Sequence, residues 1–245
     1  MLPELAAYGI RVLPGLALIT GCYVLARGER DPLLRIVSLI LAFVLIRDAM
    51  TPMGFWSFGS ADGVPWLRFV NDGTVLVVFG AGSLVFTAGV LRLDSGLRAL
   101  VVWGRFDVRN VALGAGGGML IAAPVLLGLR LWAREPGQSV PAGLVAAVLF
   151  LALAGNLAEE VLFRGLLQGR LEQTAGPRRA ALLSALLFAA CHVFLATTVT
   201  DVGLPLLAFT WYEGMVCALL RMRHGLVPAA FAHGTAIFLI ASGVL

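Results

Sequence analysis

Long apolar runs recur along the chain and are separated by short polar connections. Two weaker runs come first, at Ala7–Ala26 and Leu34–Met50, each with arginines inside it or at its edge. An α-helix needs about 20 apolar residues to cross the hydrocarbon core of a bilayer. The pattern therefore predicts an all-α, polytopic membrane protein with about eight transmembrane helices. The six clearer runs are Gly73–Leu91, Asn110–Leu129, Gln138–Ala158, Ala180–Thr200, Val202–Leu220 and His224–Leu245.

The connections between these runs are short and rich in Gly and Pro, which interrupt helices. We predict a single transmembrane domain over residues 1–245, in which 1–135 form N-terminal helices without an assigned role and 139–245 form a catalytic helical core. The connections with the clearest interruptions are Arg27–Pro32, Phe58–Pro65, Arg134–Pro141 and Thr174–Arg179.

Composition supports a membrane protein. Of the 245 residues, 60% are hydrophobic and only 13% are charged, and the mean hydropathy is +0.94. In soluble domains about a quarter of the residues are usually charged. The low charged fraction of this chain is therefore typical of a protein that lies in a lipid bilayer.

The placement of arginine predicts an orientation. All 18 basic residues are arginine; 13 fall in the odd-numbered connections between predicted helices and 4 in the even-numbered ones. The positive-inside rule then makes the odd connections cytoplasmic and puts both termini outside, in a bacterial inner (plasma) membrane. The net charge of +4 follows from this topology and from anionic lipid, so the lipid bilayer is an expected partner and nucleic acid is not.

Three cysteines lie inside apolar segments and do not form a CxxC pair, so the sequence predicts neither a disulfide framework nor a zinc–thiolate site. We interpret them as small core residues. They are Cys22, Cys191 and Cys217.

Titratable side chains enter the apolar segments mainly in the second half of the chain. A charged group at the bilayer centre costs ~3 kcal/mol even on insertion scales, so such residues usually face a protein interior and have a function. The chemistry is therefore predicted in the C-terminal half. The residues concerned are Glu159, Glu160, Arg164, His192, Glu213 and His233.

The stretch AEEVLFRG, from Ala158 to Gly165, places two carboxylates beside an arginine. Glu160 and Arg164 are four residues apart and share a helix face, so they can pair. Glu159 is rotated by about 100° from Glu160, so it is free to point into a cavity as a general base. The alternative is an interfacial Glu–Arg pair at a helix end with Glu159 in solvent.

Two histidines follow on later apolar segments. Phe188 and His192 in FAACH lie on one helix face, and His233 lies in FAHGTAIF. A lone intramembrane histidine is usually an interhelical hydrogen-bonding residue. Together with Glu159, however, two imidazoles suffice for hydrolysis: the carboxylate deprotonates water, one histidine orients the proton and the other donates to the oxyanion.

The same three residues also match a zinc site with two nitrogen ligands, one carboxylate and an open position for water. The HExxH signature is absent, which favours metal-free chemistry. We therefore expect no cofactor, with zinc at Glu159, His192 and His233 as the open alternative.

These motifs resemble those of the CPBP family, the CAAX prenyl endopeptidases and bacteriocin-processing (Abi-like) intramembrane proteases. EEVLFR fits the family motif EExxxR, FAACH fits FxxxH, and His233 fits the position of the last motif. The resemblance covers roughly 143–240. It implies an eight-helix fold around a water-filled intramembrane cavity.

The resemblance also implies roles and a substrate class. Glu159 would activate water with His192 as its partner, His233 would help stabilise the oxyanion, and Glu160 and Arg164 would support them. The substrates implied are membrane-anchored or lipid-modified proteins or peptides, in C-terminal protein sorting or maturation.

The sequence departs from the family in its last motif, which usually reads HxxxN or HxxxD. Ile237 stands at the fourth residue after His233. Loss of one oxyanion donor costs about 3 kcal/mol of transition-state stabilisation, and Thr235 or Asn156 are the candidate replacements. Glu213 has no place in the motifs; we expect it to pair with an arginine or histidine in the cavity or to contact substrate.

The leading hypothesis is thus a glutamate-dependent intramembrane endopeptidase. Ile237 motivates the alternative, a non-catalytic scaffold or bacteriocin-immunity protein that retains the cavity. A proton-relay transporter would be expected to show an inverted repeat and broken helices. A rhomboid-type serine protease would need a GxSG loop, and neither GAGS nor ASG supplies one.

Overall fold

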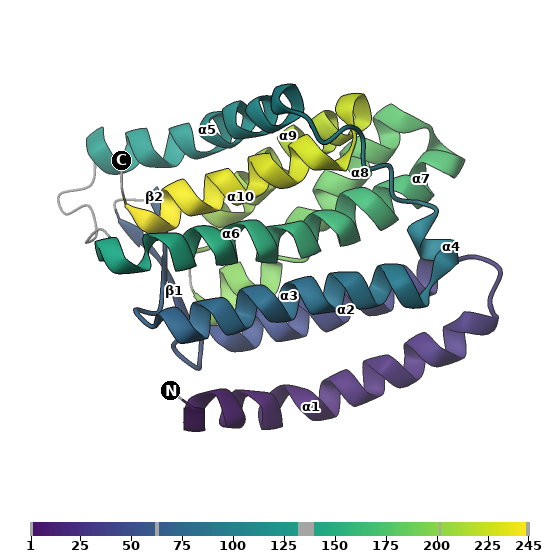
Figure 1. Ribbon diagram of the computed structural model, residues 1–245, viewed down its shortest axis with the longest axis horizontal. Coiled ribbons are helices and arrows are strands. Elements are labelled where there is room, and N and C mark those ends of the chain that lie inside the picture. Colours follow the sequence, from purple (N-terminus) through teal and green to yellow (C-terminus); the bar gives the residue numbers. More distant parts are fainter. Residues whose placement is uncertain (1, 62–63, 132–139, 201, 244–245) are drawn as a thin grey trace.

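The computed structural model describes residues 2–61, 64–131, 140–200 and 202–243. Within these ranges the chain is helical apart from one β-hairpin and the connecting loops (Figure 1). The elements are α1 (Leu2–Leu25), η1 (Ala26–Gly28), α2 (Leu33–Met50), β1 (Trp56–Ala61), β2 (Val64–Phe69), α3 (Gly73–Leu93), α4 (Ser95–Arg98), α5 (Val108–Leu131), η2 (Ala142–Leu144), α6 (Val145–Glu160), η3 (Val161–Leu167), α7 (Gln168–Ala175), α8 (Pro177–Ala190), η4 (Leu195–Val199), α9 (Leu204–His224) and α10 (Leu226–Ser242).

The all-α, membrane-type architecture is confirmed. In the described part of the chain, five helices are long and apolar enough to cross a membrane. The helix α2 is not among them, and it carries Arg35, Arg47 and Asp48 within 18 residues; α10 is apolar but has only 17 residues. A count of about eight spanning helices therefore stays a prediction. The five are Pro3–Gly28, Gly73–Leu93, Val108–Leu131, Ala142–Ala175 and Pro177–Val199.

Two predicted segments differ in detail from the observed helices. The run Ala180–Thr200 is not one regular helix: α8 ends at Ala190, and a turn leads to the π-helical η4. In the run Gln138–Ala158, α6 begins only at Val145. The boundary predicted near 135–139, and most of the connection that contains it, lie outside the described residues.

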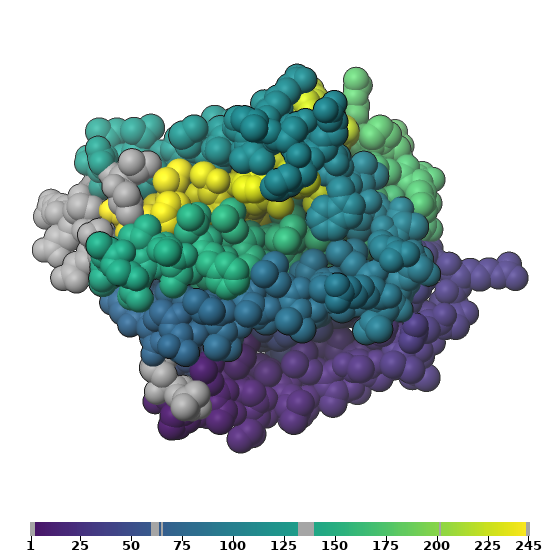
Figure 2. Space-filling model, viewed as in Figure 1, coloured from purple at the N-terminus to yellow at the C-terminus, as the bar shows by residue number. Residues whose placement is uncertain are grey.

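The helices pack side by side in a bundle (Figure 1). On the face shown in Figure 2, α10 lies between α5 and α6, and it packs against both. Glycines on α5 permit the close approach of α10, because a Cβ on Gly114 or Gly118 would lie within 2.5 Å of a side chain on α10. Small residues serve this purpose commonly in membrane bundles. The segment that carries His233 is thereby held at the centre.

Polar contacts join the odd-numbered connections at one end of the bundle. Arg170 binds Asp31 through two hydrogen bonds of 2.9 and 2.7 Å, so the fifth connection meets the first. Arg35 pairs with Asp94, which joins the first connection to the third. These contacts thus hold together residues that are far apart in the sequence, at the arginine-rich end of the bundle.

Three arginines that the sequence analysis counted among the connections are buried in the protein. Arg47, Arg164 and Arg221 have 5%, 0% and 4% relative exposure. Position in the sequence alone does not separate them, since an arginine near the end of an apolar run looks the same whether it faces water or the protein. Their removal lowers the even total from 4 to 3 and the odd total from 13 to 11, so the bias persists.

The hairpin β1–β2 was not predicted; sequence analysis treated Phe58–Pro65 as a plain connection. Trp56 pairs with Phe69 and Phe58 with Leu67, so these four side chains share one face of the ribbon. This face packs onto the bundle core. The hairpin therefore covers the interior with an aromatic surface at the opposite end from the arginine-rich connections (Figure 1).

The third and seventh connections meet by backbone contact. The amides of Leu226 and Val227 donate to the carbonyls of Val102 and Trp103. Gly225 has a φ of +89°, and a Cβ there would lie 2.5 Å from Gly104 Cα. The contact excludes any side chain at Gly225.

We expect Gly225→Ala to lower the free energy of unfolding by more than Gly176→Ala does. Gly176 has a similar φ of +78° but open space around its Cβ position, so its substitution reports only the cost of the positive-φ backbone, about 1–3 kcal/mol. Gly225→Ala adds the collision with Gly104. Thermal unfolding in detergent measures both, and equal shifts would contradict the close contact.

Candidate active site

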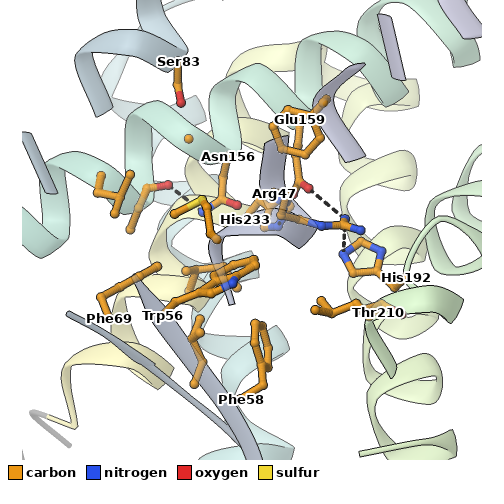
Figure 3. A pocket seen from close by; sticks show the side chains of 18 of the residues that line it. Arg47, Trp56, Phe58, Phe69, Ser83, Asn156, Glu159, His192, Thr210 and His233 are labelled. Atoms are coloured by element: carbon orange, nitrogen blue, oxygen red, sulfur yellow. Dashed lines mark hydrogen bonds and ion pairs between the residues drawn. The ribbon is translucent and has the colours of Figure 1, made fainter. Parts of the chain in front are cut away.

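A cavity of about 130 Å³ lies inside the bundle, beneath the hairpin. Its wall is mostly apolar, with aromatic side chains from β1, β2, α2, α3 and α9. Figure 3 shows the polar side chains Arg47, Glu159 and His192 on one side of this space. The aromatic side chains Trp56, Phe58 and Phe69 lie on the other side. The charged and imidazole side chains that line it are Arg47, Glu159, His192, Glu213 and His233.

Glu160 and Arg164 form a completely buried ion pair next to the cavity. Their closest atoms are 2.8 Å apart and both side chains have 0% relative exposure. The Arg164 guanidinium also donates to the Gly214 carbonyl at 3.2 Å and lies 4.2 Å from the centre of the Phe188 ring. Glu160 does not line the cavity, whereas Glu159 does. The adjacent carboxylates therefore face different surroundings.

Local helix geometry near these residues departs from the α-helix. Directly after Glu160 the chain forms the π-helical η3, and shortly after His192 it forms the second π-helical segment, η4. Extra residues per turn rotate the side chains that follow, and π-helical turns are frequent at functional sites. Arg164 lies inside η3, so this wider turn helps to set the direction of its guanidinium.

His233 contacts three carboxylates. Its Nδ1 lies 2.9 Å from Glu160 Oε1, and its Nε2 lies 3.4 Å from Glu159 Oε2 and 3.5 Å from Glu213 Oε1. Carboxylates only accept hydrogen bonds unless they carry a proton. His233 therefore links the buried ion pair to the two carboxylates that line the cavity.

His192 is oriented by contacts at both ring nitrogens. Nδ1 lies 2.8 Å from the Phe188 carbonyl, and Nε2 lies 2.9 Å from Nη1 of Arg47. A guanidinium can only donate and a carbonyl can only accept. His192 is thus held as the neutral tautomer with hydrogen on Nδ1, and its Nε2 lone pair points to the cavity side.

Arg47 is a member of the site that sequence analysis missed. It extends from α2 to both Glu159 and His192, as the dashed lines in Figure 3 show. The contact with Glu159 Oε1 is long, at 3.5 Å. A signal was present in the sequence, because Arg47 and Asp48 interrupt an apolar run, but the same signal also fits a helix end at a connection.

The weaker sequence candidates separate into two groups. Asn156 and Glu213 line the cavity, and Glu213 contacts a histidine as expected. Phe188 and Thr235 are not among its lining residues. Phe188 packs instead between Arg164 and the two histidine rings, and Thr235 lies against Gly118 of α5.

The cluster that could bind a metal ion differs from the predicted set of Glu159, His192 and His233. Among the described residues, the group whose ligand atoms all lie within 4.8 Å of one another is Glu160, Cys217 and His233. Glu160 is already paired with Arg164, whose positive charge adjoins the cluster. A cation bound there would be repelled by the Arg164 guanidinium, which disfavours a metal ion in this cluster.

Comparison with known proteins identifies the second half of the chain. Residues 141–239 match the family described as type II CAAX prenyl endopeptidase Rce1-like. The family resemblance is confirmed for this region. No curated protein and no solved structure matches the chain.

The matched region contains Glu159, His192 and His233, whereas Arg47 and the hairpin precede it. Together with the apolar helices, the match supports an intramembrane protease in general terms and an integral membrane location. The N-terminal helices nevertheless supply part of the cavity wall.

The two carboxylates should differ in their effect on stability. Glu160→Ala leaves Arg164 buried without its partner, which costs about 3–5 kcal/mol. Glu159→Ala removes only two long contacts, with Arg47 at 3.5 Å and with His233 at 3.4 Å, and Arg47 keeps its bond to Asp48. We expect a large fall in melting temperature for Glu160→Ala and a small one for Glu159→Ala. The reverse order would contradict the assignment of Glu160 as the structural anion.

Proposed function

We propose that this protein is a glutamate-dependent intramembrane endopeptidase that cleaves membrane-anchored or lipid-modified proteins or peptides. The observation that carries the proposal is the placement of Glu159, His192 and His233 around one cavity inside an apolar bundle. C-terminal sorting or maturation of membrane-anchored proteins is the process that such a substrate class implies.

In the proposed mechanism Glu159 is the general base. It removes a proton from a water molecule in the cavity, which then attacks the scissile carbonyl. His192 lies beside Glu159 as its partner and accepts from Arg47 at Nε2, and His233 stabilises the negative charge that develops. Glu160 and Arg164 hold His233 in place.

The surroundings of His192 support a metal-free reaction. Zinc would bind the Nε2 lone pair, the position that the Arg47 guanidinium now contacts at 2.9 Å. A fixed positive charge at that point repels a second cation. The proposed chemistry therefore relies on the carboxylate and the imidazoles alone.

Ile237 favours a second candidate function, a membrane protein that binds a peptide without cleaving it. It lines the cavity one helical turn after His233, so an apolar side chain occupies the position at which the family motif has an amide or carboxyl group. A membrane scaffold or immunity protein that binds a peptide in this cavity without cleaving it would tolerate this replacement.

For orientation, we propose that the arginine-rich end of the bundle faces the cytoplasm of a bacterial inner membrane. Asp31, Arg170 and Asp94 mark this end. The hairpin would then lie toward the outer face, and substrates would reach the cavity from within the bilayer.

Cleavage by point variants tests the proposed function. We expect wild type to cut a co-expressed membrane-anchored substrate, and Glu159→Ala, His192→Ala and His233→Ala to lose at least about 100-fold in rate, since each removes a part of the acid–base machinery. A zinc chelator should leave the wild-type rate unchanged. Full cleavage by Glu159→Ala would refute the proposal, and rescue of a cellular phenotype by that variant would favour the scaffold.

Cysteine accessibility tests the orientation. Single cysteines at Ser57 in the hairpin and at Arg178 after α7, in a chain whose own cysteines are replaced by alanine or serine, lie at opposite ends of the bundle. A membrane-impermeant thiol reagent added to intact cells should label the first and spare the second. Labelling of Arg178→Cys from outside would invert the proposed topology.

A further inference from the structure

Most donors on the cavity wall are already used within the protein. Ser83, Thr210 and Asn156 each donate to a main-chain carbonyl of their own helix. His192 donates from Nδ1 to the Phe188 carbonyl, and its other nitrogen accepts. A peptide hydrolase needs donors where the oxyanion forms, because charge there is otherwise unsolvated.

Arg47 differs from these donors because its guanidinium is fixed and one nitrogen faces the reacting groups. Nε bonds to Asp48 at 2.8 Å, and Nη2 donates to the Cys191 carbonyl at 2.7 Å. These two anchors leave Nη1 between Glu159 and His192, as Figure 3 shows. The side chain is only 6% exposed, so its charge acts where water screens it weakly.

We propose that Arg47 is a further catalytic residue, whose Nη1 donates to the scissile carbonyl oxygen as that oxygen becomes negative. This inference rests on the proposed function. The guanidinium would supply, from α2, the donor that the apolar Ile237 does not supply from α10. Helix α2 lies outside the region matched by the family, so this assignment extends the site to the N-terminal half.

The proposed hydrolysis has two stages, attack by water and departure of the leaving nitrogen. Glu159 takes a proton from water while the water oxygen bonds to the carbonyl carbon, and the carbonyl π electrons move to the oxygen next to Arg47. When the C=O bond re-forms, the C–N bond breaks and the leaving nitrogen takes the proton from Glu159. Arg47 takes no part in these proton transfers, because a guanidinium only donates hydrogen bonds.

Two measurements on purified full-length protein in detergent test the assignment. The first is kcat and KM on fluorescence-quenched apolar peptides, with and without a farnesylated cysteine. The second is the affinity for a phosphinic analogue, in which an anionic tetrahedral group replaces the scissile amide, compared with the parent amide peptide. The analogue reports the oxyanion donor even without turnover, because transition-state mimics bind through such groups.

We expect Arg47→Met to lower kcat by about 100-fold or more with KM changed less than about threefold. Binding of the phosphinic analogue should weaken by a similar factor, while binding of the amide peptide stays within about threefold. Arg47→Lys should fall between these values, because a lysine keeps the charge but cannot hold both anchors. Arg47→Met with Ile237→Asn should regain at least about tenfold in kcat, which a merely structural role would not allow.

Controls separate folding from catalysis. Arg47→Met with Asp48→Asn also removes the carboxylate that Arg47 Nε binds, so position 48 is not left as an unpaired buried charge, and its effect on kcat should match that of Arg47→Met. Arg35→Met with Asp94→Asn removes an ion pair between α2 and the start of α4, away from the cavity lining, and should keep wild-type kcat.

The assignment is overturned if Arg47→Met keeps kcat and analogue affinity within about threefold of wild type. It is equally overturned if Trp56→Phe or Asn156→Ala, which alter the other donors on this wall, cause the loss instead. A different result would contradict the proposed protease function. In that case the analogue still binds through Arg47, but neither wild type nor Ile237→Asn cleaves any peptide.

Discussion

The burial of one ion pair governs the arrangement of the site. Arg164 and Glu160 lie without exposure inside a bundle whose outer surface is apolar, so no water compensates their charges. Each must find partners within the protein or cost several kcal/mol. The structure provides them through the Gly214 carbonyl and the Phe188 ring for the arginine, and through His233 for the carboxylate. Once Glu160 is committed to this network, its neighbour Glu159 is turned toward the cavity.

A second polar group, from the first half of the chain, completes the cavity. Arg47 from α2, which Asp48 holds, contacts Glu159 and His192, and the hairpin closes the space above them. The N-terminal helices thus do more than anchor the protein. They contribute a positive charge next to Glu159, the proposed general base, and this charge disfavours a metal ion at His192.

Sequence analysis predicted the all-α membrane architecture, and it singled out residues that the structure places around one cavity, because their signals are strong. Apolar runs report helices in a membrane directly, and Glu159, His192 and His233 stand out because charges and imidazoles are expensive there. The division between Glu159 and Glu160 followed from helix geometry, since only Glu160 shares a face with Arg164.

Other features could not be predicted, for identifiable physical reasons. The strands of the hairpin are short and contain Gly, Ser and Pro, which read as a loop. The role of Arg47 depends on which way α2 is rotated, and the hydrophobic pattern does not determine this. Thr235 was a reasonable candidate from its distance in sequence to His233, but the close contact of α10 with Gly118 turns it toward α5.

The central claim is that Glu159 activates water rather than attacking the substrate itself. A single turnover in ¹⁸O-labelled water, analysed by mass spectrometry, tests it most directly. If water attacks the carbonyl, the label appears in the new carboxylate of the product and Glu159 stays unlabelled. If Glu159 attacks and forms a mixed anhydride, hydrolysis at the Glu159 carbonyl leaves the label in the enzyme peptide that contains it. The first result is the one predicted; label in Glu159 with an unlabelled product would contradict the account.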